Sequence, residues 1–463
     1  MEEFFKRGVR EFIDPEGLFR KKLQEKITGQ NPKEIIIKFG IDPTRSDIHL
    51  GHAFIFRKLR QLQDWGCKVV FLVGDFTAQI GDPTGRSKTR PEMEQKEIEG
   101  NMKTYLLQLE QILRTDPGVF SWIRNSDWFT SVTDISLPSD YKVNLQVKQA
   151  GSEINVNIPP NSFVGKAIVF EKSRMQISNL GLKDKVSVIT LRSFLWALRR
   201  ITFSRLIERE MFQERVKKGE RLYMHEVMYP VLQGIDSQVL YQAYGNCDLE
   251  IGGSDQLFNM IVGRDMMGAS NQSPQSVLAV SLLTGLDGKE KMSKSLNNYV
   301  AITEAPFEMF SKIMSIPDSL ILEYFTLCTY SSLSEIKKIA GGLKEGKEKP
   351  RDLKLRLAQE IVSLYHGKAK AEKSKDSFLE TFQKKKAPED LKTIKVKGGE
   401  LLSEILLKGE VVKSKSEFRR LVTEGAVSDI LKKEKISDPE FKIESDSVFK
   451  IGKKRFLKVS VES

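Results

Sequence analysis

The sequence predicts an α/β protein with a parallel sheet near its N-terminus, a helical region further on and a small basic α/β module at its C-terminus. Strand, helix and strand signals follow one another within residues 34–74, helical periodicity dominates 305–382, and positive charge is concentrated beyond residue 330. At 463 residues the chain is longer than one core normally serves, so several domains of about 100 to 200 residues are expected.

Composition indicates folded domains without a membrane or secretory segment. Hydrophobic residues make up 40% of the chain and charged residues 29%, as in globular proteins. No apolar run reaches the roughly 18 residues of a membrane span, and residues 1–7 carry charges of both signs in place of a signal peptide's apolar core. We expect a cytoplasmic protein with no membrane partner. The three cysteines are far apart and form no Cys-x-x-Cys pair, which predicts neither disulfides nor a cysteine zinc site.

The parallel sheet is predicted from two buried strands with an amphipathic helix between them. The first apolar run occupies 34–39 and is followed by an Asp-Pro-Thr turn at 42–44. Apolar residues at spacings of three and four predict a helix over 52–65, which Gly66 is placed to end, and 68–74 is the second apolar run. Such a unit forms a right-handed crossover, whose ligands bind beyond the carboxyl ends of the strands.

The remaining chain changes character twice. Between 133 and 190 polar and apolar residues alternate, as in 143–147 and 154–158, which predicts an inserted antiparallel β-subdomain. Helices are expected over 305–382, before the lysine-rich stretch 384–390. We therefore expect an α/β domain at 1–304 with a β-rich insertion at about 133–185, a helical domain at 305–383, a linker at 384–395 and a basic domain at 396–463.

Positive charge is unevenly distributed. Residues 331–463 contain 32 lysines and arginines against 22 acidic residues, whereas the first 330 residues contain 42 against 40. Clustered positive charge is typical of a polyanion-binding surface, because contact with phosphates releases counterions. A solvated lysine-rich surface is the alternative interpretation.

Two of the chain's four histidines, His49 and His52, lie three residues apart at the predicted start of a helix. A helix N-terminus offers free N–H donors and partial positive charge, and Gly51 lets a flat ligand approach the backbone. The pattern predicts a phosphate site. It also fits an N-terminal cap turn or a metal pair without its third ligand.

A second motif, Lys-Met-Ser-Lys-Ser at 291–295, follows the glycine-punctuated stretch 284–290, which predicts a mobile loop. Ammonium groups on such a loop can clamp a polyphosphate as charge builds up in a transition state. For Lys291 and Lys294 considered alone, a solvated basic loop is the alternative.

Together, the two motifs resemble the class I aminoacyl-tRNA synthetases, which form adenylates with a His-x-Gly-His element and a Lys-Met-Ser-Lys-Ser loop. Further segments look like the tyrosyl-tRNA synthetases: 40–44, 81–86, 229–236 and 252–256. The resemblance extends from about residue 4 to the C-terminus, apart from the insert. It implies a Rossmann-like parallel-sheet catalytic domain, followed by a helical anticodon-recognition domain and a small C-terminal α/β RNA-binding domain.

The resemblance also implies a set of site residues. The catalytic residues would be His49, His52, Lys291 and Lys294. ATP would contact Asp42, Thr44, Gly51, Gly253, Asp255, Lys294 and Ser295. Tyrosine would contact Asp82, Tyr229, Gln233, Asp236 and Gln256, with Asp236 receiving the phenol.

Spacing supports the pocket independently, because residues 229, 233 and 236 fall on one face of a helix. The alternative is a core tyrosine, Tyr229, with Gln233 and Asp236 on a solvated edge. Lys38 stands where part of the family has a tyrosine, so it is left out of the predicted site. Glu250 stands where some relatives have a glutamine.

The segment 412–427 resembles the small RNA-binding domain shared with a ribosomal small-subunit protein. Four cations within eight residues would face the phosphates of the RNA: Lys413, Lys415, Arg419 and Arg420. A solvated helix is the alternative.

The function implied by the resemblance is that of a tyrosine–tRNA ligase. L-tyrosine and ATP, the latter with magnesium, would give tyrosyl-adenylate and pyrophosphate, and tyrosine would then pass to the 3′ end of tRNA(Tyr). A homodimer is expected from the family, and a tightly bound protein metal site is not. Two alternatives stay open: a tryptophan-specific relative with the same catalytic motifs, and a non-catalytic RNA-binding protein descended from a synthetase.

Overall fold

The computed structural model describes residues 1–31, 33–44, 46–83, 95–129, 143–149, 152–158, 191–384, 391, 393–432, 434–452 and 455–462. The chain forms two compact units. The first unit comprises Met1–Ser46 and Ile55–Leu282, and the second unit comprises Asp47–Phe54 and Leu283–Ser463. Within the described ranges, no helix has both the length and the apolarity needed to cross a membrane. The predicted linker residues 385–390 and most of the predicted insertion lie outside the described residues.

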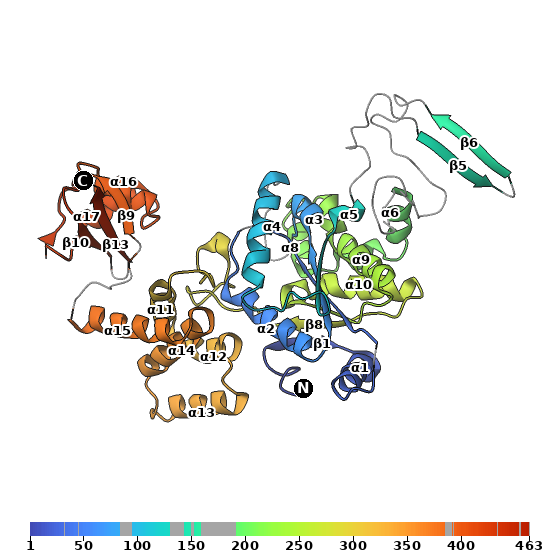
Figure 1. Cartoon of the computed structure of the whole chain (residues 1–463), viewed down its shortest axis with the longest axis horizontal. Helices are drawn as coiled ribbons and strands as arrows, with labels where there is room; N and C mark the ends of the chain where they lie inside the picture. The colour runs from blue at the N-terminus through green and yellow to red at the C-terminus, as the bar shows by residue number, and fades with distance from the viewer. Residues whose placement is uncertain are drawn as a thin grey trace. The chain divides into compact units, whose positions relative to one another are not determined.

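The first unit is built on a six-stranded sheet in the order β1-β8-β7-β2-β3-β4. Figure 1 labels β1 and its neighbour β8 in this sheet. Only β1 runs antiparallel to its neighbour, so five strands form the predicted parallel sheet. The strands are β1 (Val9–Ile13), β2 (Ile36–Ile41), β3 (Lys68–Val73), β4 (Phe120–Arg124), β7 (Leu249–Gly253) and β8 (Ser276–Val280). The order reverses between β2 and β7, and such a switch point is where sheets of this kind bind ligands.

Helices cover both faces of this sheet. On one face, Ile36 and Val70 belong to the same core as α9 (Met224–Tyr244) and α10 (Leu257–Ala269). On the other, Phe39 makes an edge-to-face contact with Phe56 of α2 (Leu50–Asp64), with ring centroids 5.5 Å apart. Alternate residues of β2 therefore face opposite helices, as the two-residue period of a strand requires.

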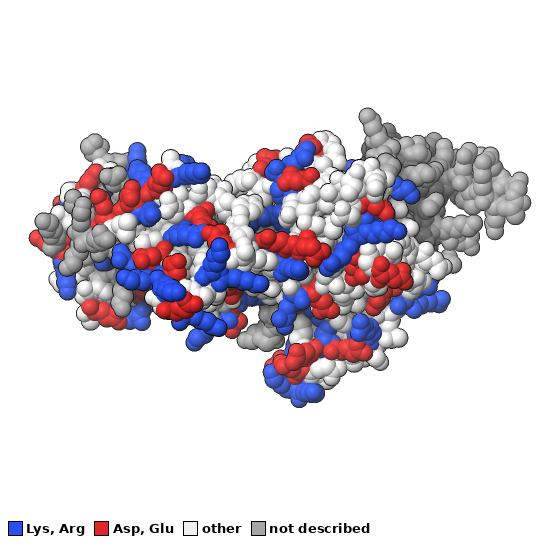
Figure 2. All heavy atoms as spheres, turned by 90° about the horizontal axis from the view of Figure 1, so that it is seen from below, with Lys and Arg blue, Asp and Glu red and all other residues white. Residues whose placement is uncertain are grey.

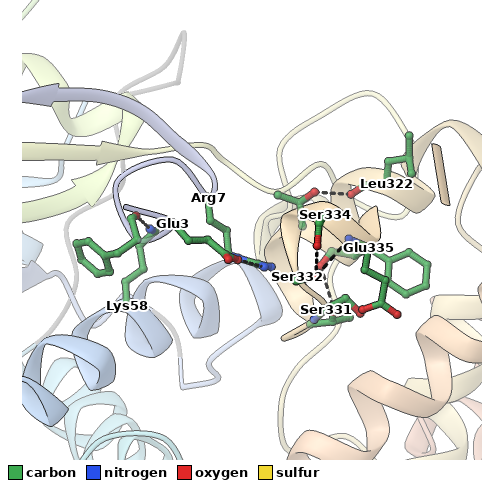
Figure 3. A network of polar contacts seen from close by, with 12 residues as sticks. Glu3, Arg7, Lys58, Leu322, Ser331, Ser332, Ser334 and Glu335 are labelled. Atoms are coloured by element: carbon green, nitrogen blue, oxygen red, sulfur yellow. Dashed lines mark hydrogen bonds and ion pairs between the residues drawn. The ribbon is translucent and has the colours of Figure 1, made fainter. Parts of the chain in front are cut away.

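Shorter elements complete the first unit. Its other helices are α1 (Leu18–Ile27), α3 (Asp75–Ile80), α4 (Gln95–Leu109), α5 (Ser126–Phe129), α6 (Leu191–Leu198), α7 (Phe203–Ile207) and α8 (Glu210–Lys217). The alternating residues of the insert form an antiparallel pair, β5 (Val143–Gln149) with β6 (Ser152–Ile158). Lys58 of α2 donates to the carbonyl of Phe4 and lies 4.4 Å from its ring, which holds the N-terminal segment in place. Figure 3 labels Lys58 together with Glu3 and Arg7 of that segment.

The second unit is helical over the range that the sequence predicts. Its helices are α11 (Pro306–Met314), α12 (Ile321–Cys328), α13 (Leu333–Lys344), α14 (Pro350–His366) and α15 (Lys368–Lys384). Ser332 caps α13 by accepting a hydrogen bond from the backbone N–H of Glu335 at 3.2 Å (Figure 3).

The C-terminal part of the second unit forms a separate mixed sheet, ordered β11-β10-β12-β13-β9. Its elements are β9 (Thr393–Lys397), α16 (Leu402–Lys408), α17 (Lys415–Thr423), β10 (Val427–Asp429), β11 (Glu434–Lys435), β12 (Ser447–Ile451) and β13 (Arg455–Glu462). Phe418 of α17 packs with Phe449 and Leu457 in a core that belongs to this part alone. The predicted α/β class is therefore confirmed at both ends of the chain.

Candidate active site

The start of α2 brings His49 and His52 together. Their rings stack with centroids 3.8 Å apart, and His49 is only 8% exposed. The backbone around His49 is fixed because Leu50 donates to the carbonyl of Val300 at 3.0 Å. Gly51 is required here, since a Cβ at this position would lie 3.1 Å from the His49 ring.

Both imidazoles are neutral at physiological pH. Burial lowers the pKa of His49 to about 3, with Lys294 and Lys291 adding to the effect. Burial, His49 and the same lysines lower the pKa of His52 well below its usual value. Within the described residues, neither buried Nδ1 atom has a hydrogen-bond partner. Two neutral imidazoles beside two lysines form a site suited to the oxygens of a polyphosphate.

The Lys-Met-Ser-Lys-Ser segment is held at its base by backbone and side-chain hydrogen bonds. Met292 donates to the carbonyl of Leu283 at 2.7 Å, and Ser293 donates its N–H to Asn298 Oδ1 at 2.8 Å. The buried Met292 side chain anchors the segment. Ser295 lies 2.9 Å from Ser293, hydroxyl to hydroxyl. The structure thus brings the predicted lysines close enough to the histidines to perturb their pKa values.

A second cluster lies on α9, whose position is set at both ends. Glu226 accepts the N–H of Tyr223 at 2.9 Å and forms a buried ion pair with Arg215 at 2.8 Å. Gly245 ends the helix in the left-handed conformation, with φ of 81°. Close packing against α10 requires Gly234, because a Cβ there would come within 2.5 Å of Met266 Sδ.

The predicted tyrosine-site residues on α9 point into the first unit. Tyr229 donates its hydroxyl to Asp42 Oδ2 at 2.7 Å, and the other oxygen of Asp42 accepts from Thr77 at 2.8 Å. Gln256 donates to Asp82 at 2.6 Å. The structure therefore gives these predicted residues polar partners in the interior of the protein. The alternative interpretation had placed Gln233 and Asp236 on a solvated edge.

Asp236 is fully enclosed. Trp128 Nε1 donates to one of its oxygens at 3.1 Å, and Asn125 lies 3.5 Å from the other. Burial raises the pKa of Asp236 to about 7, although Lys38 and these donors oppose the rise. Asn125 and Trp128 were missed by the sequence analysis, although Asn125 directly follows β4, at the carboxyl end where sites are expected.

The other predicted contacts of the first unit lie at strand ends. Gly253 is the last residue of β7, and Asp255 follows it in a short 3₁₀ helix. Thr44 donates its N–H to the carbonyl of Asp42 at 2.8 Å. The sequence analysis also missed Arg209, which is buried near Asp82 and Asp255; burial lowers the pKa of Arg209, and the two carboxylates oppose that shift.

Of the four cations predicted to contact RNA, Lys413 precedes α17, Lys415 is its first residue, and Arg419 and Arg420 lie further along the helix. Three of them pair with exposed carboxylates: Lys415 with Glu404 at 2.8 Å, Arg419 with Glu440 at 3.4 Å and Arg420 with Glu424 at 3.8 Å. Exposed pairs of this kind are weak and exchangeable. On the face that Figure 2 shows, blue and red side chains are interspersed. Among the described residues, that face shows no large area of blue side chains without red ones among them.

A cluster of neutral imidazoles and lysines on a chain with an α/β parallel-sheet fold is the arrangement expected of a nucleotide-dependent enzyme. The model of the family of tRNA synthetases class I (W and Y) matches residues 30–148 and 183–383. A tyrosine–tRNA ligase of Francisella tularensis is 36% identical over 462 residues, covering 99% of this chain and 98% of the relative. Tyrosine–tRNA ligase 2 of Clostridium acetobutylicum is 37% identical over 463 residues, with coverages of 99% and 98%. The chain belongs to the class I tRNA synthetases and, within them, to the tyrosine–tRNA ligase family.

Solved structures agree at the level of the fold. The mitochondrial tyrosyl-tRNA synthetase of Aspergillus nidulans, in a C-terminally truncated form, superposes with a TM-score of 0.53 at 20% identity, covering 82% of this chain and 93% of that one. The tyrosyl-tRNA synthetase of Archaeoglobus fulgidus, complexed with L-tyrosine, gives 0.51 at 18% identity, with coverages of 81% and 98%. At these identities, the likeness concerns the fold alone.

Proposed function

We propose that the chain activates L-tyrosine with ATP and transfers it to tRNA(Tyr). The observation that carries the proposal is the cluster in the second unit, where two neutral imidazoles, of buried His49 and half-buried His52, lie beside Lys291 and Lys294. Neutral N–H donors and lysine charges suit a reaction in which negative charge spreads over phosphates and no protein nucleophile is needed.

In the first step, a carboxylate oxygen of tyrosine attacks the α-phosphorus of ATP in line, and the bond to pyrophosphate breaks. His49 and His52 donate hydrogen bonds to phosphate oxygens, and Lys291 and Lys294 neutralise the departing pyrophosphate. Magnesium would be held through the phosphates of ATP, where it would help to neutralise their charge. Within the described residues, no group of three or more His, Cys, Asp or Glu side chains is arranged to hold an ion.

Recognition of tyrosine is assigned to the first unit. Asp82, Tyr229, Gln233 and Gln256 surround the ammonium group and ring, and Asp236 accepts the phenol. A site built to satisfy a phenol rejects phenylalanine because the buried carboxylate would be left without its partner. The known example of this effect, a discrimination of roughly 10⁵, comes from the tyrosyl-tRNA synthetases themselves. The nucleotide or the ammonium group also contacts further residues: Asp42, Thr44, Gly51, Gly253, Asp255 and Ser295.

In the second step, the terminal ribose hydroxyl of the tRNA attacks the adenylate carbonyl and displaces AMP. We assign the anticodon to residues 305–383 and the RNA phosphates to Lys413, Lys415, Arg419 and Arg420 in residues 396–463. The catalytic domain would comprise residues 1–304. The family match, which omits 149–182, supports an insertion within it. The enzyme would work in the cytoplasm.

Homodimerisation is proposed as well. Six exposed apolar side chains come from α6, α7, α8 and the beginning of α9: Leu195, Trp196, Phe203, Val216, Tyr223 and Met224. Both α6 and α7 pack on α9, and α8 is joined to α9 by the Arg215–Glu226 ion pair, so these side chains come from neighbouring elements. Exposed apolar patches of this kind mark protein interfaces. In sedimentation velocity, Met224→Glu should shift a dimer towards monomer, and an unchanged dimer would place the interface elsewhere.

The function is tested by ATP–pyrophosphate exchange with each of the twenty amino acids in turn. Exchange should depend on tyrosine, and Lys294→Ala should lower its kcat about 100-fold. Exchange that responds to tryptophan would favour the tryptophan-specific alternative, and no exchange with any amino acid would favour a non-catalytic RNA-binding protein. Undiminished exchange in Lys294→Ala would overturn the role of the loop.

A further inference from the structure

A buried ion pair lies beneath α9 and takes no part in the reaction described above. Lys38 of β2 and Glu250 of β7 are direct neighbours in the parallel ladder, and Lys38 Nζ lies 2.9 Å from Glu250 Oε1. They are 0% and 1% exposed. Desolvating two charges costs so much that apolar residues of similar volume are often equally stable there. The stability of the sheet therefore gives no reason for an ion pair at this position.

Lys38 binds two successive turns of α9. Its ammonium group donates to the backbone carbonyl of Gln233 at 2.9 Å and to Ser237 Oγ at 2.8 Å, in addition to Glu250. Three donors thus meet three acceptors, which uses the full capacity of a lysine. Ser237 directly follows Asp236, so the lysine fixes the helix between the two predicted tyrosine contacts Gln233 and Asp236.

Glu250 binds the side chain of the same glutamine. Gln233 Nε2 donates to Glu250 Oε1 at 2.9 Å. The other carboxylate oxygen accepts from Gln275 Nε2 and, at 3.4 Å, from Ser237 Oγ. An ionised carboxylate only accepts hydrogen bonds, so the Gln233 amide must turn its NH₂ towards Glu250. Its oxygen is then left to accept a hydrogen bond from a ligand.

We propose that the Lys38–Glu250 pair is a positioning element of the amino-acid site, which orients the Gln233 amide so that its Oε1 accepts a hydrogen bond from the α-ammonium group of tyrosine. This inference rests on the proposed function. Neither Lys38 nor Glu250 touches the substrate. They act through Gln233, whose backbone Lys38 holds and whose side chain Glu250 holds.

The test replaces the pair by Lys38→Met with Glu250→Met, which removes both charges with unbranched side chains of similar length. Binding is measured by calorimetry with two ligands that differ in the group concerned. Tyramine has the phenol and the ammonium group, whereas 3-(4-hydroxyphenyl)propionate has the phenol and no ammonium group. The double variant should bind tyramine about tenfold more weakly, as expected for one charge-assisted hydrogen bond, and the propionate within about twofold of wild type.

Glu250→Gln alone is the matched control, because its amide oxygen can still accept from Gln233, and it should retain most of the affinity for tyramine. If the double methionine variant does not fold, Lys38→Gln with Glu250→Gln is used to compare the two ligands. Its two neutral amides can donate or accept, so they no longer dictate the orientation of the Gln233 amide. Equal weakening of both ligands in a folded variant, or unchanged tyramine binding, would overturn the proposal. Failure of the proposed function can be distinguished from failure of the positioning proposal. If the proposed function is wrong, the wild-type protein itself shows no tyrosine-dependent exchange.

Discussion

Replacing Asp236 by asparagine should stabilise the first unit at pH 8 and change it little at pH 5. The pKa of Asp236 is about 7 in the folded protein because burial disfavours the charged form. In the unfolded chain the pKa of an aspartate is about 3.9. The folded state therefore keeps a proton that the unfolded state has lost, and stability falls as pH rises from about 4 to about 7 and then levels off.

The magnitude follows from these two pKa values. Each difference of one in pKa corresponds to about 1.4 kcal/mol, so Asp236 lowers the free energy of unfolding by about 4 kcal/mol at pH 8 and about 1.5 kcal/mol at pH 5. Asparagine removes this loss and can still accept from Trp128, but it loses the contact with Asn125, worth about 1 kcal/mol. The expected net gain is about 3 kcal/mol at pH 8 and close to zero at pH 5.

Urea unfolding followed by tryptophan fluorescence measures this effect in the right part of the molecule, because all four tryptophans, Trp65, Trp122, Trp128 and Trp196, belong to the first unit. The same variant should raise the KM for tyrosine in pyrophosphate exchange and weaken discrimination against phenylalanine. Opposite effects on stability and on tyrosine binding would identify Asp236 as a group whose buried charge serves recognition.

Asp75→Asn is the matched control. Asp75 is also buried, but it accepts the N–H groups of Phe76 and Ser126 at 3.0 Å and the Ser126 hydroxyl at 2.6 Å. The NH₂ group of asparagine would face hydrogen-bond donors of Phe76 or Ser126. This variant should therefore be less stable at both pH values. A gain in Asp236→Asn that is the same at pH 5 and pH 8, or a loss at both, would refute the reasoning.

The remaining predictions concern the phosphate cluster and the C-terminal part of the chain. Because the pKa of His49 is about 3, kcat/KM for ATP at saturating tyrosine should show no titration near pH 6.5 in Asp236→Asn, which lacks the carboxyl group whose own pKa is about 7. A fall there would contradict neutral donors. Gly51→Ala would put a methyl group 3.1 Å from the His49 ring and should lower kcat of exchange roughly tenfold, whereas Gly100→Ala, with open space around it, should leave kcat unchanged. Deleting the residues after 388 should spare exchange and abolish aminoacylation; equal loss of both would argue against separate roles.

Local sequence patterns predicted the central elements well. The apolar run at 34–39 became β2 (Ile36–Ile41), the periodic stretch at 52–65 became α2 (Leu50–Asp64), and 68–74 became β3 (Lys68–Val73). These elements are decided by which residues can be buried on a strand or along a helix, and that pattern is contained in neighbouring residues. The two motifs predicted to be catalytic could likewise be recognised in the sequence because each is contiguous.

Partners distant in the chain could not be predicted in this way. Trp128 and Asp236 are 108 residues apart, and Lys38 and Ser237 are 199 apart, yet both pairs are hydrogen-bonded. Lys38 illustrates the difference. A lysine within an apolar strand gives no indication of its partner until the β2–β7 register sets it beside Glu250.

By itself, the sequence predicted the kind of chemistry, from a motif pair typical of adenylation, a helix face for the amino acid and a basic C-terminal module. Tertiary structure decided the state of those groups. Burial makes the histidines neutral and raises the pKa of Asp236, and the ladder of β2 and β7 fixes the amide of Gln233. The reason is physical, since protonation and hydrogen-bond direction depend on the solvent and charges around a group, which only the folded chain brings together.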